Sequence, residues 1–168
     1  MEEDQILILQ MHYSNASDDP LDSTTVNLNV VEDVEREITT WFYIHGDLEI
    51  PSNEESYLES ASFKMRNYTD YNGTMELLAL GPHMHTLGRA SSSKLIHADG
   101  SETCLIDVPS YDFNWQRVYT YTEPILIQPN DRMELNCIFD STSASSTTYW
   151  GDGTGDEMCL MTMFTYRP

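Results

Sequence analysis

Residues 133–139 read Met-Glu-Leu-Asn-Cys-Ile-Phe, in which every second residue from Met133 to Phe139 is apolar while Glu134 and Asn136 lie between them. Successive side chains of a strand point to opposite faces, so this alternation predicts a strand with one face in the core and one in water. The same period of two recurs in residues 26–30 (Val-Asn-Leu-Asn-Val) and 61–65 (Ala-Ser-Phe-Lys-Met).

Turn-forming residues separate such segments along the whole chain. They are Ser17–Pro20, Gly46-Asp47, Pro51–Asn53, Asn72-Gly73, Asp99-Gly100, Pro129–Asp131 and Gly151–Gly153. Short β-branched and aromatic segments between turns are typical of all-β sandwiches and barrels. Helical periodicity is confined to residues 32–40, where it favours a turn or two of helix. The sequence therefore predicts an all-β protein, an antiparallel and jelly-roll-like β-sandwich with a single domain over residues 1–168.

Two local signals add detail to this prediction. Asn72-Gly73 lies between the apolar residues 63–65 and 75–80, and this dipeptide is a strong signal for a two-residue hairpin. Pro82 follows the second of these segments. Since proline cannot donate a hydrogen bond to a ladder, we expect a strand edge or break at Pro82.

The charge of the chain excludes several classes of protein. Asp and Glu number 28 against 8 Lys and Arg, which gives a formal net charge of −20. Binding to nucleic acid needs clustered Lys and Arg, and so does docking on anionic lipid, so neither partner is expected. No apolar run reaches the length of a membrane span, and Met1–Asp4 do not begin a signal peptide. The expectation is a soluble, acidic domain.

The three cysteines are Cys104, Cys137 and Cys159. Cys137 shares a predicted strand face with Leu135 and should point inward, and Cys159 shares a face with Met161 in the last predicted strand. A Cys137–Cys159 disulfide would leave Cys104 unpaired. From the composition alone, three buried free thiols are an equally good interpretation.

The most informative stretch is residues 81–89, Gly-Pro-His-Met-His-Thr-Leu-Gly-Arg. On an extended strand, His83 and His85 point to the same side and Met84 to the other. Two imidazoles on one strand can form half of a copper or zinc site. Spacing alone leaves open that these are two ordinary exposed or core histidines.

Three motifs together resemble a known family. They are Leu9–Tyr13 (Leu-Gln-Met-His-Tyr), His83–Arg89 and Asp156–Cys159 (Asp-Glu-Met-Cys). In this order they resemble the catalytic copper domain of the ascorbate-dependent type II copper monooxygenases, the family of peptidylglycine α-hydroxylating and dopamine β-monooxygenases. Asp112–Gln116 followed by Glu123–Ile125 is similar to the bacterial branch of that family.

The resemblance implies a ligand set and a reaction. Copper would be held by His83, His85 and Met158, and these residues would act in catalysis through the bound ion. A thioether favours Cu(I), while imidazoles also suit Cu(II). The implied reaction is hydroxylation of an unactivated C–H bond of a small-molecule or peptide substrate by dioxygen, with ascorbate as reductant. The resemblance also implies the Cys137–Cys159 disulfide and a secreted, periplasmic or extracellular protein.

The sequence departs from the family at the second copper site. In the family, an upstream domain supplies a His-His pair and the Leu-Gln-x-His-Tyr motif supplies a third ligand. Here His12 matches the third ligand, but the 168 residues hold no His-His pair. His12 is therefore interpreted as a remnant, a structural residue, or a ligand completed by a domain outside this chain.

The sequence also departs from the amidating members. They carry arginine two residues before the first histidine, and Asn and Tyr two and four residues after the methionine. Here these positions hold Gly81, Leu160 and Thr162. The residues that would bind a peptide glycine carboxylate are missing, so no amidating activity is expected.

Two other functions compete with the monooxygenase reading. The first is a non-catalytic module that stores, carries or senses copper, suggested by the missing second site. The second is a calcium-stabilised β-sandwich for recognition, suggested by the acidic, Gly-rich residues 152–157. No site role is expected for His45, which is packed or exposed at a strand end, for solvent-facing His97, or for Arg89, which is assigned to a surface role or a salt bridge to a carboxylate.

Overall fold

A computed structural model describes residues 6–11, 21 and 23–168. The chain divides into two compact units, Met1–Glu35 and Arg36–Pro168. All strands found in the described residues lie in the second unit. The expectation of one domain over residues 1–168 therefore stays a prediction.

The described residues of the first unit form neither helix nor strand. The strand predicted for residues 26–30 is therefore wrong, and Val26, Leu28 and Val30 are exposed. Alternation of apolar and polar residues is compatible with a half-buried strand, but a strand forms only where its backbone pairs with a neighbouring strand. The helical turn predicted for residues 32–40 is also wrong, because residues 32–37 are irregular and Ile38 already begins a strand.

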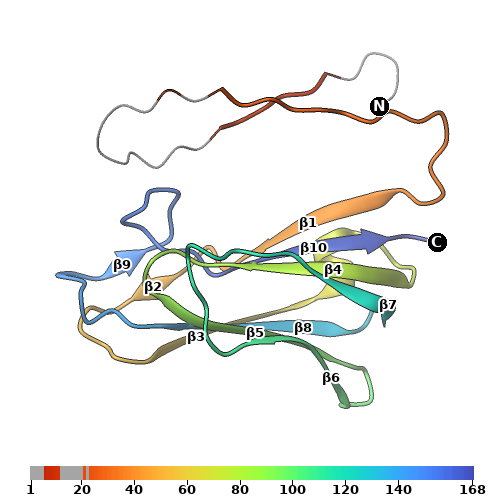
Figure 1. The fold of residues 1–168 in the computed structure, drawn as a ribbon. Helices are drawn as coiled ribbons and strands as arrows, with labels where there is room; N and C mark the ends of the chain where they lie inside the picture. The colour runs from red at the N-terminus through yellow and green to blue at the C-terminus, as the bar shows by residue number, and fades with distance from the viewer. Residues whose placement is uncertain (1–5, 12–20, 22) are drawn as a thin grey trace. The chain divides into compact units, whose positions relative to one another are not determined.

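The second unit contains two four-stranded sheets, and Figure 1 shows them as two layers. The first sheet has the order β1 (Ile38–Ile44), β10 (Leu160–Tyr166), β4 (Met75–His83) and β7 (Tyr119–Ile127). The second sheet has the order β3 (Tyr57–Lys64), β8 (Arg132–Phe139), β5 (Gly88–Ile96) and β6 (Glu102–Val108). All neighbouring strands are antiparallel. The predicted all-β, antiparallel sandwich is confirmed.

Three short elements complete the second unit. β2 (Glu49–Ile50) pairs with β9 (Thr148–Tyr149), and the five-residue helix α1 (Met65–Thr69) follows β3. No helix in the described part of the chain is long and apolar enough to cross a membrane.

The core lies between the two sheets. On β8, the predicted inward residues Met133, Leu135, Cys137 and Phe139 are each 0% exposed, which confirms the alternation. A disulfide joins Cys137 to Cys159, the residue before β10, and thereby ties the two sheets together. Cys104 is free and exposed on β6.

The hairpin predicted at Asn72-Gly73 is wrong. β3 and β4 belong to different sheets, and the chain crosses between them through α1 and residues 70–74. A two-residue type I′ hairpin turn needs positive φ at both central residues, and neither Asn72 nor Gly73 has one. The irregularity expected at Pro82 is present, because β4 pairs with β7 only as far as Leu80 and Pro82 keeps β10 as its partner.

Candidate functional site

The two histidines of the His-x-His motif lie at the end of β4, and their rings are in contact. His83 is the last residue of β4 and His85 follows two residues later. Their ring centroids are 5.2 Å apart with an interplanar angle of 86°. Met84 between them is 0% exposed. The sequence spacing therefore predicted the shared side of the two imidazoles.

Each imidazole is held through its Nδ1 atom. His83 Nδ1 lies 2.6 Å from Oε1 of Gln116, and the Nε2 amide of Gln116 donates to the carbonyl oxygen of Phe113. His85 Nδ1 donates to the carbonyl oxygen of Asp156 at 2.9 Å. With Nδ1 protonated, the Nε2 atom of each neutral ring keeps a free lone pair, and no described residue forms a hydrogen bond with either Nε2. Oxygen partners of this kind orient metal-ligating histidines.

The two rings differ in exposure. His85 is only 7% exposed, whereas His83 is half-buried. Burial lowers the pKa of His83, an effect that the hydrogen bond to Gln116 opposes and neighbouring His85 reinforces. The net effect favours the neutral imidazole, which is the form that binds metals.

Glu157 fixes the backbone of both segments that carry the expected ligands, at His85 and at Met158. It is 0% exposed, and its carboxylate accepts the backbone N–H groups of His85 at 2.8 Å, Leu87 at 2.6 Å and Met158 at 3.1 Å. Burial raises the pKa of Glu157, and these hydrogen bonds work in the opposite direction. This role of Glu157 was not predicted from the sequence, although Glu157 precedes Met158 in one of the three motifs.

Tyr111 holds the residue between the two histidines. Its hydroxyl donates to the carbonyl oxygen of Met84 at 2.7 Å and accepts the Met84 N–H at 3.0 Å. The backbone N–H of Tyr111 in turn donates to the carbonyl oxygen of Arg89 at 2.7 Å. Tyr111 was not predicted as a site residue either, and nothing in the sequence near it indicates the contact.

His83 and Met158 line one pocket, which we call the site pocket, with a volume of about 360 Å³. Its lining also contains Phe42, Gly81, Pro82, Gln116, Arg117, Val118, Leu160 and Thr162. His85 is not among the lining residues, but it contacts His83, and Glu157 bonds to the backbone of both His85 and Met158. The structure thus brings the three residues of the expected ligand set into one region.

The site pocket lies over two transverse rows of the first sheet. In one row Phe42 pairs with Thr162 and Thr162 with Gly81, and two residues further along the strands Leu160 pairs with His83. The three positions at which the sequence departs from the amidating members, Gly81, Leu160 and Thr162, therefore all line the same pocket.

The other candidate residues lie elsewhere. His12 is outside the described residues. His45 lies 3.1 Å from Glu59, just after β1 ends. His97 was expected to face solvent but is half-buried, because its ring lies between Asp131 Oδ1 at 3.2 Å and Thr103 Oγ1 at 2.8 Å. Arg89 forms the expected salt bridge, to Asp140 at 3.6 Å.

The acidic loop of residues 152–157 does not support the hypothesis of a calcium-stabilised β-sandwich. The carboxylate of Asp156 accepts the backbone N–H of Gly153 at 3.1 Å, and that of Glu157 is occupied by the three N–H groups described above. In the part of the chain that the structure describes, no three His, Cys, Asp or Glu side chains are grouped so as to hold a metal ion. The expected copper site differs from such a group because its third ligand is a thioether.

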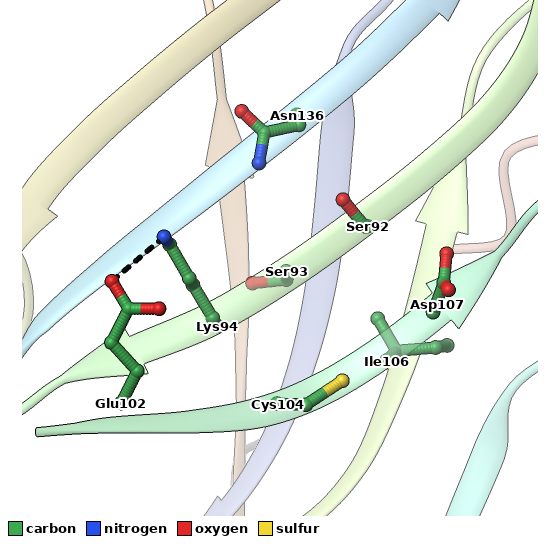
Figure 2. A pocket seen from close by; sticks show the side chains of 8 residues that line it. All are labelled: Ser92, Ser93, Lys94, Glu102, Cys104, Ile106, Asp107 and Asn136. Carbon is green, nitrogen blue, oxygen red and sulfur yellow. Dashed lines mark hydrogen bonds and ion pairs between the residues drawn. The ribbon is translucent and has the colours of Figure 1, made fainter.

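A second pocket, of about 360 Å³, lies on the second sheet, away from the motif residues. Figure 2 shows Cys104 and Ile106 on β6 beside Ser92 and Lys94 on β5. The ammonium group of Lys94 is 2.9 Å from the carboxylate of Glu102 and 3.4 Å from that of Glu134. These ion pairs engage the ammonium group of Lys94, and we assign this second pocket no function.

Comparison with known proteins points to one family. The model described as "Copper type II ascorbate-dependent monooxygenase, C-terminal domain" matches residues 39–168, more than half of the chain. The protein named "Putative DBH-like monooxygenase protein 2" of Homo sapiens is 27% identical over 95% of the chain. Peptidyl-glycine alpha-amidating monooxygenase A of Xenopus laevis is 28% identical over 95% of the chain.

These relatives are much longer than the chain. The match spans 34% of the human protein and 17% of the Xenopus protein. Among solved structures, one of infectious bursal disease virus, Gx strain, matches 88% of the chain and 41% of its own at 12% identity, with a TM-score of 0.31. That likeness is too weak to support any argument. The similarity to the bacterial branch stays a prediction, since both relatives named here are animal proteins.

Proposed function

Because the chain belongs to the family of C-terminal domains of copper type II ascorbate-dependent monooxygenases, we propose that it binds one copper ion through His83, His85 and Met158. On this proposal the domain supports hydroxylation of a substrate C–H bond by dioxygen, with ascorbate as the reductant. The same proposal includes a domain upstream of this chain and a secreted or periplasmic location. It interprets His12 as a remnant, a structural residue, or a ligand completed by that upstream domain. The Cys137–Cys159 disulfide is consistent with an extracellular location.

The observation that supports the proposal is the hydrogen bonding of the two imidazoles. Both Nδ1 atoms are held by oxygen atoms, so both Nε2 lone pairs stay available, and His83 shares its pocket with Met158. Two imidazoles and a thioether form a donor set that suits copper in both oxidation states. The residues present therefore fit the metal that the family name implies.

A bound copper ion would supply the one-electron chemistry that activation of dioxygen requires. The residues of the chain provide the surroundings of that ion. Gln116 and the backbone of Asp156 orient the two rings, and Glu157 fixes the backbone that carries His85 and Met158. Three protein ligands leave a position for a small molecule, as catalytic metal sites require.

The test is copper stoichiometry with X-ray absorption on the Cu(I)-loaded protein. We expect one equivalent of copper and a Cu–S contribution that disappears in Met158→Ile. Met11→Ile is the matched control, because it removes an exposed thioether outside the sandwich. Loss of retained copper from the unmutated protein, or a sulfur signal that survives in Met158→Ile, would contradict the proposed site.

The second candidate function is a non-catalytic copper module. It needs only the proposed site of His83, His85 and Met158 and no second copper ion. Oxygen uptake separates the two readings. The copper-loaded protein with ascorbate and a substrate should consume oxygen in proportion to hydroxylated product if it is a monooxygenase domain, and should bind Cu(I) without substrate-dependent uptake if it is a storage or carrier module.

A further inference from the structure

We propose that the site pocket takes an uncharged, apolar group of the substrate, and that Gly81 keeps open the space for that group. The inference rests on the proposed function, since it names the substrate class of the same site. It is argued from the chemistry of the pocket lining and from the room around the Cα atom of Gly81.

The lining offers a substrate few charged groups. Among the described residues that line the pocket there is no Asp, Glu or Lys, and Arg117 is the only permanently charged one. The guanidinium of Arg117 lies 4.3 Å from the ring centroid of Trp115, which does not line the pocket. Of the residues on either side of Arg117, Gln116 contacts His83, and Val118 Cγ2 would lie 3.4 Å from a Cβ atom at Gly81. The guanidinium of Arg117 is thus stacked on a ring that does not line the pocket, while its backbone carbonyl oxygen would lie 3.6 Å from a Cβ atom at Gly81.

A cationic substrate group would therefore enter the pocket without a counter-charge. The protein carries a net charge of −20, and its field attracts cations toward the surface. Among the described lining residues a cation would find no carboxylate, and a carboxylate would find only a guanidinium that is already stacked on Trp115. Burial of a charge without a partner is costly. The pocket therefore selects neutral groups, and Phe42, Pro82, Val118 and Leu160 give that group apolar contacts.

Gly81 determines how much room such a group has. A Cβ atom at this position would lie 3.4 Å from Cγ2 of Val118 and 3.7 Å from Cβ of Thr162, which are ordinary contacts. A larger side chain would extend into the pocket of about 360 Å³. A cavity of about 150 Å³ already holds a benzene molecule, so the open pocket has room for a ring with a short chain.

The test is binding of three probes that share one carbon skeleton and differ in charge. They are 3-phenylpropanamide (neutral), 3-phenylpropanoate (anionic) and 3-phenylpropan-1-amine (cationic). Binding to the metal-free protein is followed by NMR of ¹³C-methyl methionine, with Met158 as the reporter in the pocket. Gly81→Leu fills the pocket, and Gly46→Leu is the matched control, because a Cβ atom at Gly46 has no neighbour within 4 Å. Thermal melting confirms that both variants fold.

We expect the amide to bind at least ten times more tightly than either charged probe, and Gly81→Leu to weaken its binding at least tenfold while Gly46→Leu leaves it unchanged. Equal binding of a charged probe, no amide binding at millimolar concentration, or unchanged binding in a folded Gly81→Leu variant would overturn the inference. Copper retention is measured on separate samples. Amide selectivity without copper retention supports the inference about the pocket and refutes the proposed function. Copper retention without amide selectivity supports the proposed function and refutes the inference about the pocket.

Discussion

One carboxylate oxygen of Glu157 accepts the backbone N–H of His85 at 2.8 Å across 72 residues of sequence. The same oxygen accepts the N–H of Met158 at 3.1 Å. The loop after β4 and the segment before β10 are therefore joined at a single buried atom. This contact relates the positions of the two proposed ligands, although neither ligand side chain takes part in it.

Glu157→Gln should destabilise the protein. The amide has one acceptor oxygen in place of two, and its NH₂ group must face at least one of the three backbone N–H donors. A buried donor left without a partner costs about 1–3 kcal/mol. We expect a loss of that size in the free energy of unfolding, measured by urea denaturation, together with weaker copper retention.

Glu55→Gln provides the matched control for this substitution. Glu55 is exposed, and removal of its charge should change the free energy of unfolding by less than about 0.5 kcal/mol. If the Glu157 and Glu55 variants unfold at the same urea concentration, the buried carboxylate does not hold the two segments together.

Tyr111→Phe should also destabilise the fold, through Met84. The substitution removes the hydroxyl that satisfies both the N–H and the carbonyl oxygen of this buried residue. We expect a loss of about 1–3 kcal/mol in the free energy of unfolding. Tyr149→Phe, at a side chain that is 57% exposed, should leave the urea midpoint unchanged. An unchanged midpoint in Tyr111→Phe would mean that water replaces the hydroxyl.

The fold could be predicted from the sequence only where local pattern and long-range pairing agree. The alternation in residues 133–139 predicted β8 correctly, because β8 lies between β3 and β5 and buries one face. Residues 26–30 have an equally regular pattern and form no strand. Asn72-Gly73 predicted a hairpin, but the chain there crosses between sheets. Pairing partners are a property of the whole chain, which a local pattern does not contain.

The same distinction holds for the candidate site. The shared side of His83 and His85 follows from a spacing of two residues and could be predicted. The contacts that orient them connect positions far apart in sequence, 33 residues for Gln116, 72 for Glu157 and 27 between Tyr111 and Met84. No spacing rule indicates such contacts. Met158 was identified as a candidate through its motif, and its role as a copper ligand stays a prediction.

The disulfide should contribute substantially to stability. Cys137 and Cys159 are separated by 22 residues, and closing a loop of that length in the unfolded chain corresponds to about 3 kcal/mol. We expect the double variant Cys137→Ala/Cys159→Ala to lose about that amount in urea denaturation. Cys104→Ala, at the exposed free thiol, is the control and should behave as the unmutated protein does. Equal stability of the double variant and this control would show that the bridge constrains little.

The stability of the protein should fall at alkaline pH in part because of Tyr121. Burial, and to a lesser degree the charge of Cys104, raises the pKa of Tyr121 to about 12, and its hydroxyl donates to the carbonyl oxygen of Leu105 at 2.7 Å. In the unfolded chain a tyrosine ionises near pH 10. Between about pH 10 and pH 12 the unfolded state therefore binds fewer protons than the folded state, and the free energy of unfolding decreases as the pH rises. Tyr121→Phe removes this contribution, so its free energy of unfolding should be lower than that of the unmutated protein at pH 9 and should approach it at pH 11. Urea denaturation of both proteins at these two pH values measures the difference, and an unchanged difference would show that Tyr121 ionises equally in both states.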